Sequence, residues 1–279
     1  MGVRIRDVFM GGLPELRYEP VDKRIRGELA GRTIVDSRRA MLVWEPKRVV
    51  ASYAIPIEDL DASTTPDAVS APGDAERVRA PMLGDRPVLD PSVPFSVHTA
   101  AGESLTLRAQ DGAYASTAFR AQDAALSGYL ILDFGVCDAW YEEDELNIGH
   151  PRDPFHRIEV VHSSRHVQVV LDSTVIAESS RPFLLLEAPL PARYYLPVED
   201  VRTELLTPSD KESVCAYKGR ACYWSLPSES DIVWSYPEPM REAAEIKGRL
   251  AFLNEQIDLV VDGEPLARPV TPWSRRPPS

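Results

Sequence analysis

The sequence has no long apolar run, few cysteines and no apolar segment near its N-terminus. A membrane-spanning helix needs about 20 predominantly apolar residues, and no stretch of the chain reaches that length. The three cysteines, Cys137, Cys215 and Cys222, form no CxxC pair. An odd number of cysteines in a chain without a signal-peptide core favours reduced thiols over a disulfide framework. We therefore expect a cytoplasmic protein.

Basic residues are also scarce, with 31 Lys and Arg against 43 Asp and Glu and a formal net charge of -12. Affinity for phosphate backbones and anionic lipids depends on Lys and Arg, so we expect no nucleic-acid and no membrane partner. The glycine motifs of phosphate and dinucleotide sites are absent, so no cofactor is expected. His162 and His166 have the spacing of a helical metal pair, but they lie between strand-like segments and further ligands are missing. No metal is expected.

Proline, by contrast, is abundant, with 25 residues spread along the chain. Because a proline inside a helix removes a hydrogen bond and clashes with the preceding turn, long helices have little room. A short helix is predicted where a proline precedes two acids, at residues 56–60 and 197–206. Strands are predicted from short alternating or β-branched segments at residues 167–171, 174–177, 183–186 and 256–261. The expected fold class is mostly β, or a β-rich α+β fold.

The two halves of the sequence resemble each other. Residues 29–45 align with 171–187, residues 53–60 with 194–201, and residues 91–102 with 208–219. Glu45 matches Glu187 in this alignment, whereas His98 and Ala101 face Cys215 and Lys218. We interpret the repeat as a tandem duplication that gives two homologous compact β domains, each with a short helix. Any reactive pair formed by Cys215 and Lys218 would then exist only in the second copy.

The alignment also predicts the domain boundaries. Residues 1–146 form a degenerate first repeat, residues 147–268 an intact second repeat, and residues 269–279 a proline-rich tail that we expect to be disordered. The first repeat carries an insertion at residues 61–90, which is rich in Pro, Ala, Asp and Ser and has no apolar period. We predict a surface loop there.

The second half resembles a known family. Its motifs are RYYLP at 193–197, LTPSD at 206–210, CAYKG at 215–219, YW at 223–224, WSY at 234–236, FLNE at 252–255 and VDG at 261–263. In this order and spacing they are similar to the domain of unknown function numbered 427, which is also filed under a nucleotidyltransferase-like name. The resemblance implies a compact, mostly β domain in each half, of a tent-like kind, and no demonstrated activity. The sequence lacks the Gly-Ser and Asp-x-Asp pattern that nucleotidyl transfer would need.

Residues 213–224 predict a hairpin that turns at Lys218 and Gly219, since glycine supplies the positive φ of a tight turn. A two-residue loop at this point places Cys215 opposite Cys222. Lys218 could lower the pKa of the Cys215 thiol, which makes these two residues the candidate catalytic pair. The alternative, which we favour, is two small buried thiols beside a solvated lysine.

Aromatic residues gather in the second repeat, and they are Tyr194, Tyr195, Tyr217, Tyr223, Trp224, Trp234 and Tyr236. Core packing accounts for some of them, but with nearby polar residues they could also line a pocket for a planar or sugar-like ligand. The candidate ligand-binding residues are Arg193, Tyr194, Tyr195, Asp200, Ser209, Cys215, Tyr217, Lys218, Trp234, Tyr236 and Glu255.

Three functions remain open at this point. The first is an uncharacterised cytoplasmic protein whose second repeat binds a small ligand while the first repeat is a structural partner. The second is an enzyme, either thiol-dependent or transferring a nucleotidyl group. The third is a protein-interaction module. A pocket around Cys215 and Lys218 favours the first two, whereas an exposed apolar patch favours the third.

Overall fold

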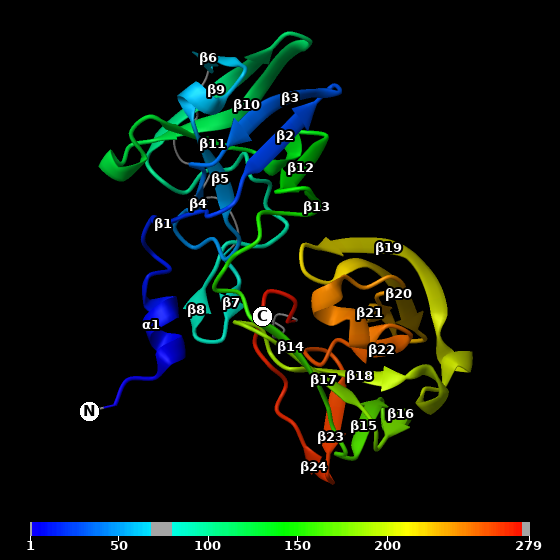
Figure 1. The fold of residues 1–279 in the computed structure, drawn as a ribbon. Coiled ribbons are helices and arrows are strands. Elements are labelled where there is room, and N and C mark those ends of the chain that lie inside the picture. The colour runs from blue at the N-terminus through cyan, green and yellow to red at the C-terminus, as the bar shows by residue number, and fades with distance from the viewer. Residues whose placement is uncertain (1, 68–79, 275–279) are drawn as a thin grey trace. The chain divides into compact units, whose positions relative to one another are not determined.

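The structure, a computed structural model, describes residues 2–67 and 80–274. The chain divides into unit 1, Met1–Pro81 with Arg86–Asp153, and unit 2, Met82–Asp85 with Pro154–Ser279. Both units consist of antiparallel sheets joined by turns and short helices (Figure 1). The expected mostly β fold of two domains is confirmed. Within the described residues, no helix has the length and apolar character needed to span a membrane.

Unit 1 contains a seven-stranded and a four-stranded sheet. The order in the larger sheet is β1 (Arg17–Pro20), β4 (Met41–Trp44), β5 (Ser52–Pro56), β11 (Tyr129–Leu132), β10 (Gly112–Ala121), β9 (Gly102–Ala109) and β6 (Ser63–Pro66). The order in the smaller sheet is β13 (Glu145–Asn147), β12 (Ala139–Glu142), β2 (Ile25–Leu29) and β3 (Arg32–Ser37). The helices are α1 (Ile5–Gly11) and the 3₁₀ turns η1 (Ile57–Asp59), η2 (Ala124–Leu126) and η3 (Phe134–Val136).

Unit 2 also contains a seven-stranded and a four-stranded sheet. The order in the larger sheet is β14 (Ile158–His162), β17 (Phe183–Glu187), β18 (Arg193–Pro197), β22 (Arg249–Phe252), β21 (Glu229–Ser235), β20 (Gly219–Leu226) and β19 (Thr207–Cys215). The order in the smaller sheet is β16 (Thr174–Ser179), β15 (Val167–Leu171), β23 (Asp258–Val261) and β24 (Glu264–Pro265). The 3₁₀ turns are η4 (Val198–Asp200), η5 (Thr203–Leu205) and η6 (Arg241–Ile246), and two short strands, β7 (Met82–Leu83) and β8 (Arg86–Pro87), precede β9 in the chain.

The two units share one strand order. From edge to edge, β1, β4, β5, β11, β10, β9 and β6 occupy the places of β14, β17, β18, β22, β21, β20 and β19. The register agrees as well, since Leu42 lies opposite Tyr53 in unit 1 and Leu184 lies opposite Tyr194 in unit 2. Residues at the same place in this shared order and register are called counterparts below.

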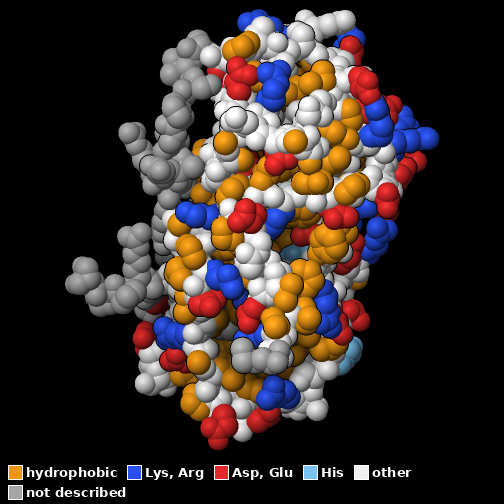
Figure 2. All heavy atoms as spheres, turned by 90° about the vertical axis from the view of Figure 1, so that its left-hand side faces the viewer, with side chains coloured by type: hydrophobic (Ala, Val, Ile, Leu, Met, Phe, Trp, Pro, Cys, Tyr) orange, Lys and Arg blue, Asp and Glu red, His pale blue; other side chains and the backbone are white. Residues whose placement is uncertain are grey.

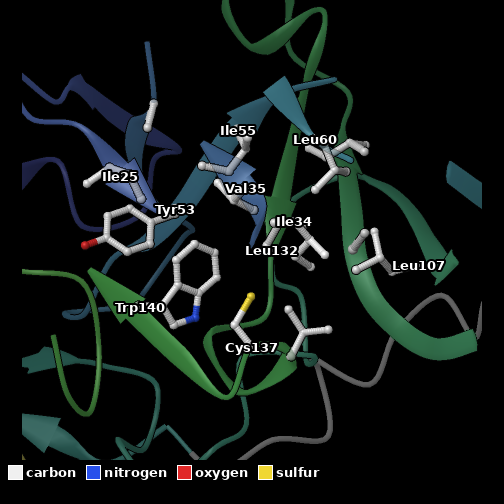
Figure 3. Packing of buried hydrophobic residues seen from close by; sticks show 14 of the residues in the cluster. Ile25, Ile34, Val35, Tyr53, Ile55, Leu60, Leu107, Leu132, Cys137 and Trp140 are labelled. Carbon is white, nitrogen blue, oxygen red and sulfur yellow. The ribbon is translucent and has the colours of Figure 1, made fainter. Parts of the chain in front are cut away.

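Each unit buries a core between its two sheets. In unit 1, strands β2 and β5 turn Ile25 and Ile55 into this core, and both side chains are fully buried. Figure 3 shows Trp140 of β12 beside Tyr53 of β5, and their ring centroids are 5.2 Å apart. Burying one large apolar side chain stabilises a fold by about 1.5–3 kcal/mol, so this core can hold the two sheets together. Gly27 is required there, because a Cβ at that position would lie 2.8 Å from the sulfur of Cys137.

A smaller core covers the other surface of each seven-stranded sheet, which we call the outer face. In unit 1 it is made by Val43, Ala54, Phe119, Ala121, Leu126 and Ile131. In unit 2 it is made by Phe183, Leu185, Tyr195, Ala221, Tyr236, Ala243, Ile246 and Ala251. The 3₁₀ turns η2 and η6 contribute to these two cores.

The short helices predicted at 56–60 and 197–206 are 3₁₀ turns rather than α-helices. In unit 2 the segment splits into η4 and η5, because Val201 between them forms an isolated β-bridge with Ala177. In unit 1, Leu60 forms the same bridge with Val35 directly after η1. A residue that pairs with a strand cannot continue a helix, which limits each turn to three residues.

The structure differs from the loop predicted at residues 61–90. Residues 63–66 form the edge strand β6, and Val88 and Leu89 are buried. Leu105 and Trp224 occupy the same place in the shared register. Pro66 lies opposite Leu105, and Pro208 lies opposite Trp224, so the counterpart of Pro208 is Pro66 rather than Pro91. An edge strand with little apolar alternation gives a weak sequence signal, which explains the difference. Residues 68–79 lie outside the described residues.

The structure also differs from the disordered tail predicted at residues 269–279. Thr271 is 3% exposed, and its hydroxyl donates a 2.7 Å hydrogen bond to Oε1 of Glu255. The side chain of Gln256 donates a 2.9 Å hydrogen bond to the carbonyl of Trp273. Prolines exclude helix from this segment but do not prevent it from docking. Residues 275–279 lie outside the described residues.

Charges of both signs are mixed on the described surface that Figure 2 shows, where acidic and basic side chains lie next to one another. Although the net charge of the chain is -12, the acidic side chains on this side do not form a single acidic patch.

Candidate functional site

A row of side chains crosses the outer face of unit 2. In register, Phe183 lies opposite Tyr195, Tyr195 opposite Ala251, Ala251 opposite Trp234, and Trp234 opposite Tyr223. Directly opposite residues of neighbouring strands point to the same surface of a sheet, so these side chains form one continuous line. Ala251 is small, and the indole nitrogen of Trp234 donates a 3.0 Å hydrogen bond across it to the hydroxyl of Tyr195. We call these five residues the aromatic row.

The counterpart row in unit 1 is largely aliphatic. Its members, taken in the same order, are Met41, Ala54, Ile131, Phe119 and Ser104. The backbone pairing is the same, yet two phenols and one indole of unit 2 have no equivalent here. The two outer faces therefore share geometry but differ in chemistry.

A buried ion pair lies beside the aromatic row. Arg193 donates from its two terminal nitrogens to the two carboxylate oxygens of Glu255, at 2.6 Å each. The guanidinium carbon of Arg193 lies 5.6 Å from the ring centroid of Trp234. Burial alone would raise the pKa of Glu255, but the hydrogen bonds and charge of Arg193 outweigh it and lower that pKa. The counterpart of Arg193 is Ser52, so the described part of unit 1 has no such pair at this position.

A second buried pair joins Lys218 to Glu187. The ammonium of Lys218 donates to one carboxylate oxygen of Glu187, and Nε2 of His156 lies 3.2 Å from the other. Burial would raise the pKa of Glu187, but the charge of Lys218 and the hydrogen bonds of both partners hold it at about 2. Burial would likewise lower the pKa of Lys218, but the charge and hydrogen bond of Glu187, with smaller contributions from Cys215 and Tyr195, together outweigh it and raise that pKa. Lys218 is therefore a charged ammonium, which is neither a nucleophile nor a base.

The hairpin that carries Lys218 is not the one predicted. Cys215 lies opposite Gly219, and Cys222 lies opposite Glu212, so the loop has three residues instead of two. Cys215 packs in the outer-face core with Ala221 and Tyr223, and Cys222 between these two points to the other surface of the sheet. The predicted pairing of Cys215 with Cys222 is wrong, because the loop at residues 216–218 starts directly after Cys215 and sets one register from the Cys215–Gly219 pair to the Glu212–Cys222 pair.

In unit 1 the counterpart of Glu187 is satisfied without lysine. Glu45 accepts hydrogen bonds from the backbone nitrogens of Thr99 at 2.7 Å and Ala100 at 2.9 Å. Nδ1 of His98 lies 2.8 Å from its other oxygen. Both units thus keep a buried carboxylate at this position, and within the described residues only unit 2 pairs it with a lysine.

The predicted site residues do not all meet on the outer face. Arg193, Tyr195, Cys215, Trp234 and Tyr236 lie there, and Ser209 lies opposite Tyr223 at the end of the row. The ring of Tyr217 stacks on that of His156, with centroids 4.2 Å apart. Tyr194 and Trp224 instead belong to the core between the sheets, on the opposite surface.

Asp200 is placed elsewhere and has a structural role. Its carboxylate accepts a 2.6 Å hydrogen bond from the hydroxyl of Ser179 and forms a 2.9 Å ion pair with Arg181. In unit 1, Asp59 makes the same contacts with the counterparts of these two residues, at 2.7 Å and 2.6 Å. A contact present in both units holds the shared fold together and does not distinguish unit 2.

Sequence reasoning missed Glu187 and His156 as members of the site, and it named Tyr223 among the aromatic residues that could line a pocket without including it in the candidate ligand-binding residues. Glu187 carried a usable signal, because it is one of the matches between the two halves and a carboxylate retained inside a strand needs a partner. His156 precedes the first strand of unit 2, and nothing in its sequence context indicates its contact with Glu187.

A shallow depression of about 460 Å³ lies in unit 1, away from the predicted residues. Arg39 and Glu58 in its lining are already paired with each other. Over the residues that the structure describes, no three His, Cys, Asp or Glu side chains converge as a metal-binding group.

Residues 159–263 match a family model with the short name NTP_transf_9, described as "Domain of unknown function (DUF427)". The resemblance noted in the sequence is confirmed for this segment, which lies within unit 2 and spans the aromatic row and both buried ion pairs. A comparison with curated proteins finds no match.

Proposed function

We propose that the outer face of unit 2 binds a small ligand, and that unit 1 is a degenerate duplicate that acts as its structural partner. The observation that carries the proposal is the aromatic row, which is aromatic and polar in unit 2 and largely aliphatic in unit 1 on the same backbone pairing. If core packing alone determined the residues of this row, the largely aliphatic side chains found in unit 1 would be sufficient in unit 2 as well.

The buried charges support the same conclusion. An ion pair removed from water costs several kcal/mol per ion in desolvation, and apolar replacements of similar volume are often neutral or stabilising. Unit 1 has Ser52 in place of Arg193, and Glu45 is held by backbone nitrogens rather than by a lysine. The fold therefore does not require these cations, which fits a role in binding.

The partly exposed members of the face indicate the kind of ligand. Tyr223 and Trp234 present ring surfaces, and the hydroxyl of Tyr223 lies 2.8 Å from that of Ser213. Aromatic surfaces beside hydroxyl groups suit a planar or sugar-like ring, because the ring stacks while its polar rim forms hydrogen bonds.

Binding fits the site better than catalysis does. The thiol-dependent reading relies on Lys218 to activate Cys215, but the ammonium of Lys218 is committed to Glu187. The nucleotidyl-transfer reading has the short name of the matched family in its favour and no motif in the sequence. The free thiols of all three cysteines fit a cytoplasmic location.

One feature of unit 1 favours a protein partner as a second function. On α1, the side chains of Ile5, Val8 and Phe9 are 68%, 59% and 65% exposed. Apolar residues at this spacing form a stripe on one side of a helix. This stripe is independent of the outer face of unit 2, so the two functions can be tested separately.

Saturation-transfer NMR on the full chain tests the binding proposal, with adenosine and methyl β-D-glucopyranoside as probes. At least one probe is expected to receive saturation, and Tyr223→Ser is expected to abolish most of it. This variant introduces the residue that unit 1 carries at the counterpart position, so the fold is expected to persist. Tyr18→Ser on β1 is the matched control and should leave the signal unchanged. Absence of transfer to both probes, or equal transfer in the Tyr223→Ser variant, contradicts the proposal.

A further inference from the structure

We infer that the ligand of this face is uncharged: a molecule with a sugar or ribose ring that carries hydroxyl groups, such as a nucleoside or a sugar, rather than its phosphorylated form. The inference rests on the proposed function and concerns the charge of the ligand. It follows from the pairing of the cations at the outer face of unit 2.

The two buried cations are each neutralised by a carboxylate that is equally buried. The side chains of Arg193 and Glu255 are 8% and 0% exposed, and those of Lys218 and Glu187 are 10% and 7% exposed. An anionic ligand would have to compete with a carboxylate already in contact with its cation. The displaced carboxylate would then remain buried without a partner, which is strongly unfavourable.

An exposed cation at the Tyr223 end of the row is matched as well. Nζ of Lys211 lies 4.6 Å from the ring centroid of Tyr223 and 4.0 Å from the carboxylate of Asp231. Its side chain is 47% exposed, so its attraction for an anion is screened by solvent. At the other end of the row, the guanidinium carbon of Arg249 lies 3.6 Å from the ring centroid of Phe183, and Arg249 together with Arg181 faces the carboxylates of Glu199 and Asp200. Because Arg193, Lys218 and Lys211 face three further carboxylates, the described residues of the face offer no excess positive charge.

The face does keep hydrogen-bonding capacity for uncharged groups. A hydroxyl has one donor and two acceptor positions, and the 2.8 Å bond between Ser213 and Tyr223 uses one donor and one acceptor. The remaining positions lie at the partly exposed edge of the aromatic row. They match the hydroxyl rim of a sugar or of a ribose, whose C–H surface or base can stack on Tyr223 and Trp234.

Isothermal titration calorimetry on the full chain tests the inference with two matched pairs of probes. The pairs are adenosine with adenosine 5'-monophosphate, and methyl β-D-glucopyranoside with its 6-phosphate. In the pair that binds, the uncharged member is expected to bind at least about tenfold more tightly, a difference of roughly 1.4 kcal/mol.

Two variants test the cause of the preference. Glu255→Gln removes the counter-charge of Arg193 and keeps a hydrogen-bond acceptor, so it should reduce the preference for the uncharged probe. Asp231→Asn does the same for the exposed Lys211 and keeps the test valid if the first variant does not fold. Asp258→Asn, in the exposed pair with Arg268, is the control and should leave the preference unchanged.

The outcomes separate the two proposals. Tighter binding of the phosphorylated member by the wild-type chain overturns the inference on charge and leaves ligand binding intact. An unchanged preference in both Glu255→Gln and Asp231→Asn also overturns it. Failure of all four probes to bind removes the proposed function and, with it, the inference.

Discussion

The ammonium of Lys218 donates a hydrogen bond to Oε2 of Glu187, and the two side chains are 10% and 7% exposed. A charge pair so far removed from water depends on both partners, because either one alone would remain as an uncompensated buried charge. In unit 1 the counterpart carboxylate of Glu45 is satisfied by backbone nitrogens and His98. The difference identifies Lys218 as a feature of unit 2 rather than of the shared fold.

Replacing Glu187 alone should destabilise the protein. Glu187→Gln is expected to lower the free energy of unfolding at pH 7 by about 3–5 kcal/mol, the usual cost of removing one partner of a buried pair. Urea denaturation followed by circular dichroism measures the loss. The matched control is Glu238→Gln, in an exposed pair with Lys247, which should cost less than about 1 kcal/mol.

The cost of Glu187→Gln should depend on pH. The pKa of Glu187 is lowered from 4.5 to about 2 in the folded protein, since the charge of Lys218 and the hydrogen bonds of Lys218 and His156 together outweigh burial. Such a carboxylate stabilises the fold fully above the pKa of the unfolded chain and loses this contribution as pH falls towards the folded value. The difference between wild type and variant should therefore be constant just above pH 5 and shrink as the pH falls from there to 2. A difference independent of pH across this range contradicts the assignment of a charged pair.

Replacing both partners should cost much less than replacing one. The double variant Glu187→Leu with Lys218→Met fills a similar volume with apolar atoms and leaves no unpaired charge. It is expected to be at least about 2 kcal/mol more stable than Glu187→Gln, because apolar substitutes for buried pairs are often neutral or stabilising. Denaturant midpoints of the three proteins give the comparison. A double variant as unstable as the single one would mean that the pair contributes more than its charges.

The sequence predicts where the strands of unit 2 lie better than it predicts which residues pair with one another across them. Alternating segments correctly predicted β15, β16, β17 and β23, since one buried surface imposes a period of two. The hairpin register at Cys215 could not be predicted, because it depends on a three-residue loop at residues 216–218 that leaves no distinct pattern in the sequence. The ion pairs could not be predicted either. Lys218 is 31 residues from Glu187, and Arg193 is 62 from Glu255, so only the folded sheet brings them together.

The alignment of the two halves of the sequence did not single out the residues that differ most in chemistry between the two units. It drew attention to Cys215 and Lys218, whereas the clearer differences lie at Tyr195 and Tyr236, whose counterparts are Ala54 and Ala121. The difference at Tyr195 is already visible in the alignment of residues 53–60 with 194–201, whereas the one at Tyr236 appears only when residues are matched by strand register.

The cysteine of unit 1 should be unreactive in the folded protein. Burial, and to a lesser extent the charge of Asp138, raises the pKa of Cys137 to about 12, so almost no thiolate is present at pH 8. Iodoacetamide at pH 8, followed by peptide mass spectrometry, should leave Cys137 unmodified in native protein and modify it in urea. The partly exposed Cys215 is the internal reference. Modification of native Cys137 at the rate seen in urea would show that its pocket is open.

The docked segment after Pro269 should contribute measurable stability. Thr271→Val removes the hydroxyl that donates to Glu255 while keeping the shape of the side chain. The expected loss is about 1.5–3 kcal/mol, the range for a hydrogen bond to a charged group. Thr174→Val on β16 is the exposed control and should change stability by less than about 0.5 kcal/mol. Equal effects of the two variants would show that the segment is not docked on Glu255.

The indole N–H resonance of Trp234 provides the most direct test of ligand binding at the aromatic row. In ¹H–¹⁵N spectra of the full chain titrated with adenosine or methyl β-D-glucopyranoside, this signal and the amide signal of Tyr223 should shift and saturate. The amide signals of their counterparts in unit 1, Phe119 and Ser104, should stay in place, because that row lacks the aromatic and polar groups. Saturable shifts confined to unit 1, or no shift of Trp234 with either probe, would contradict the account.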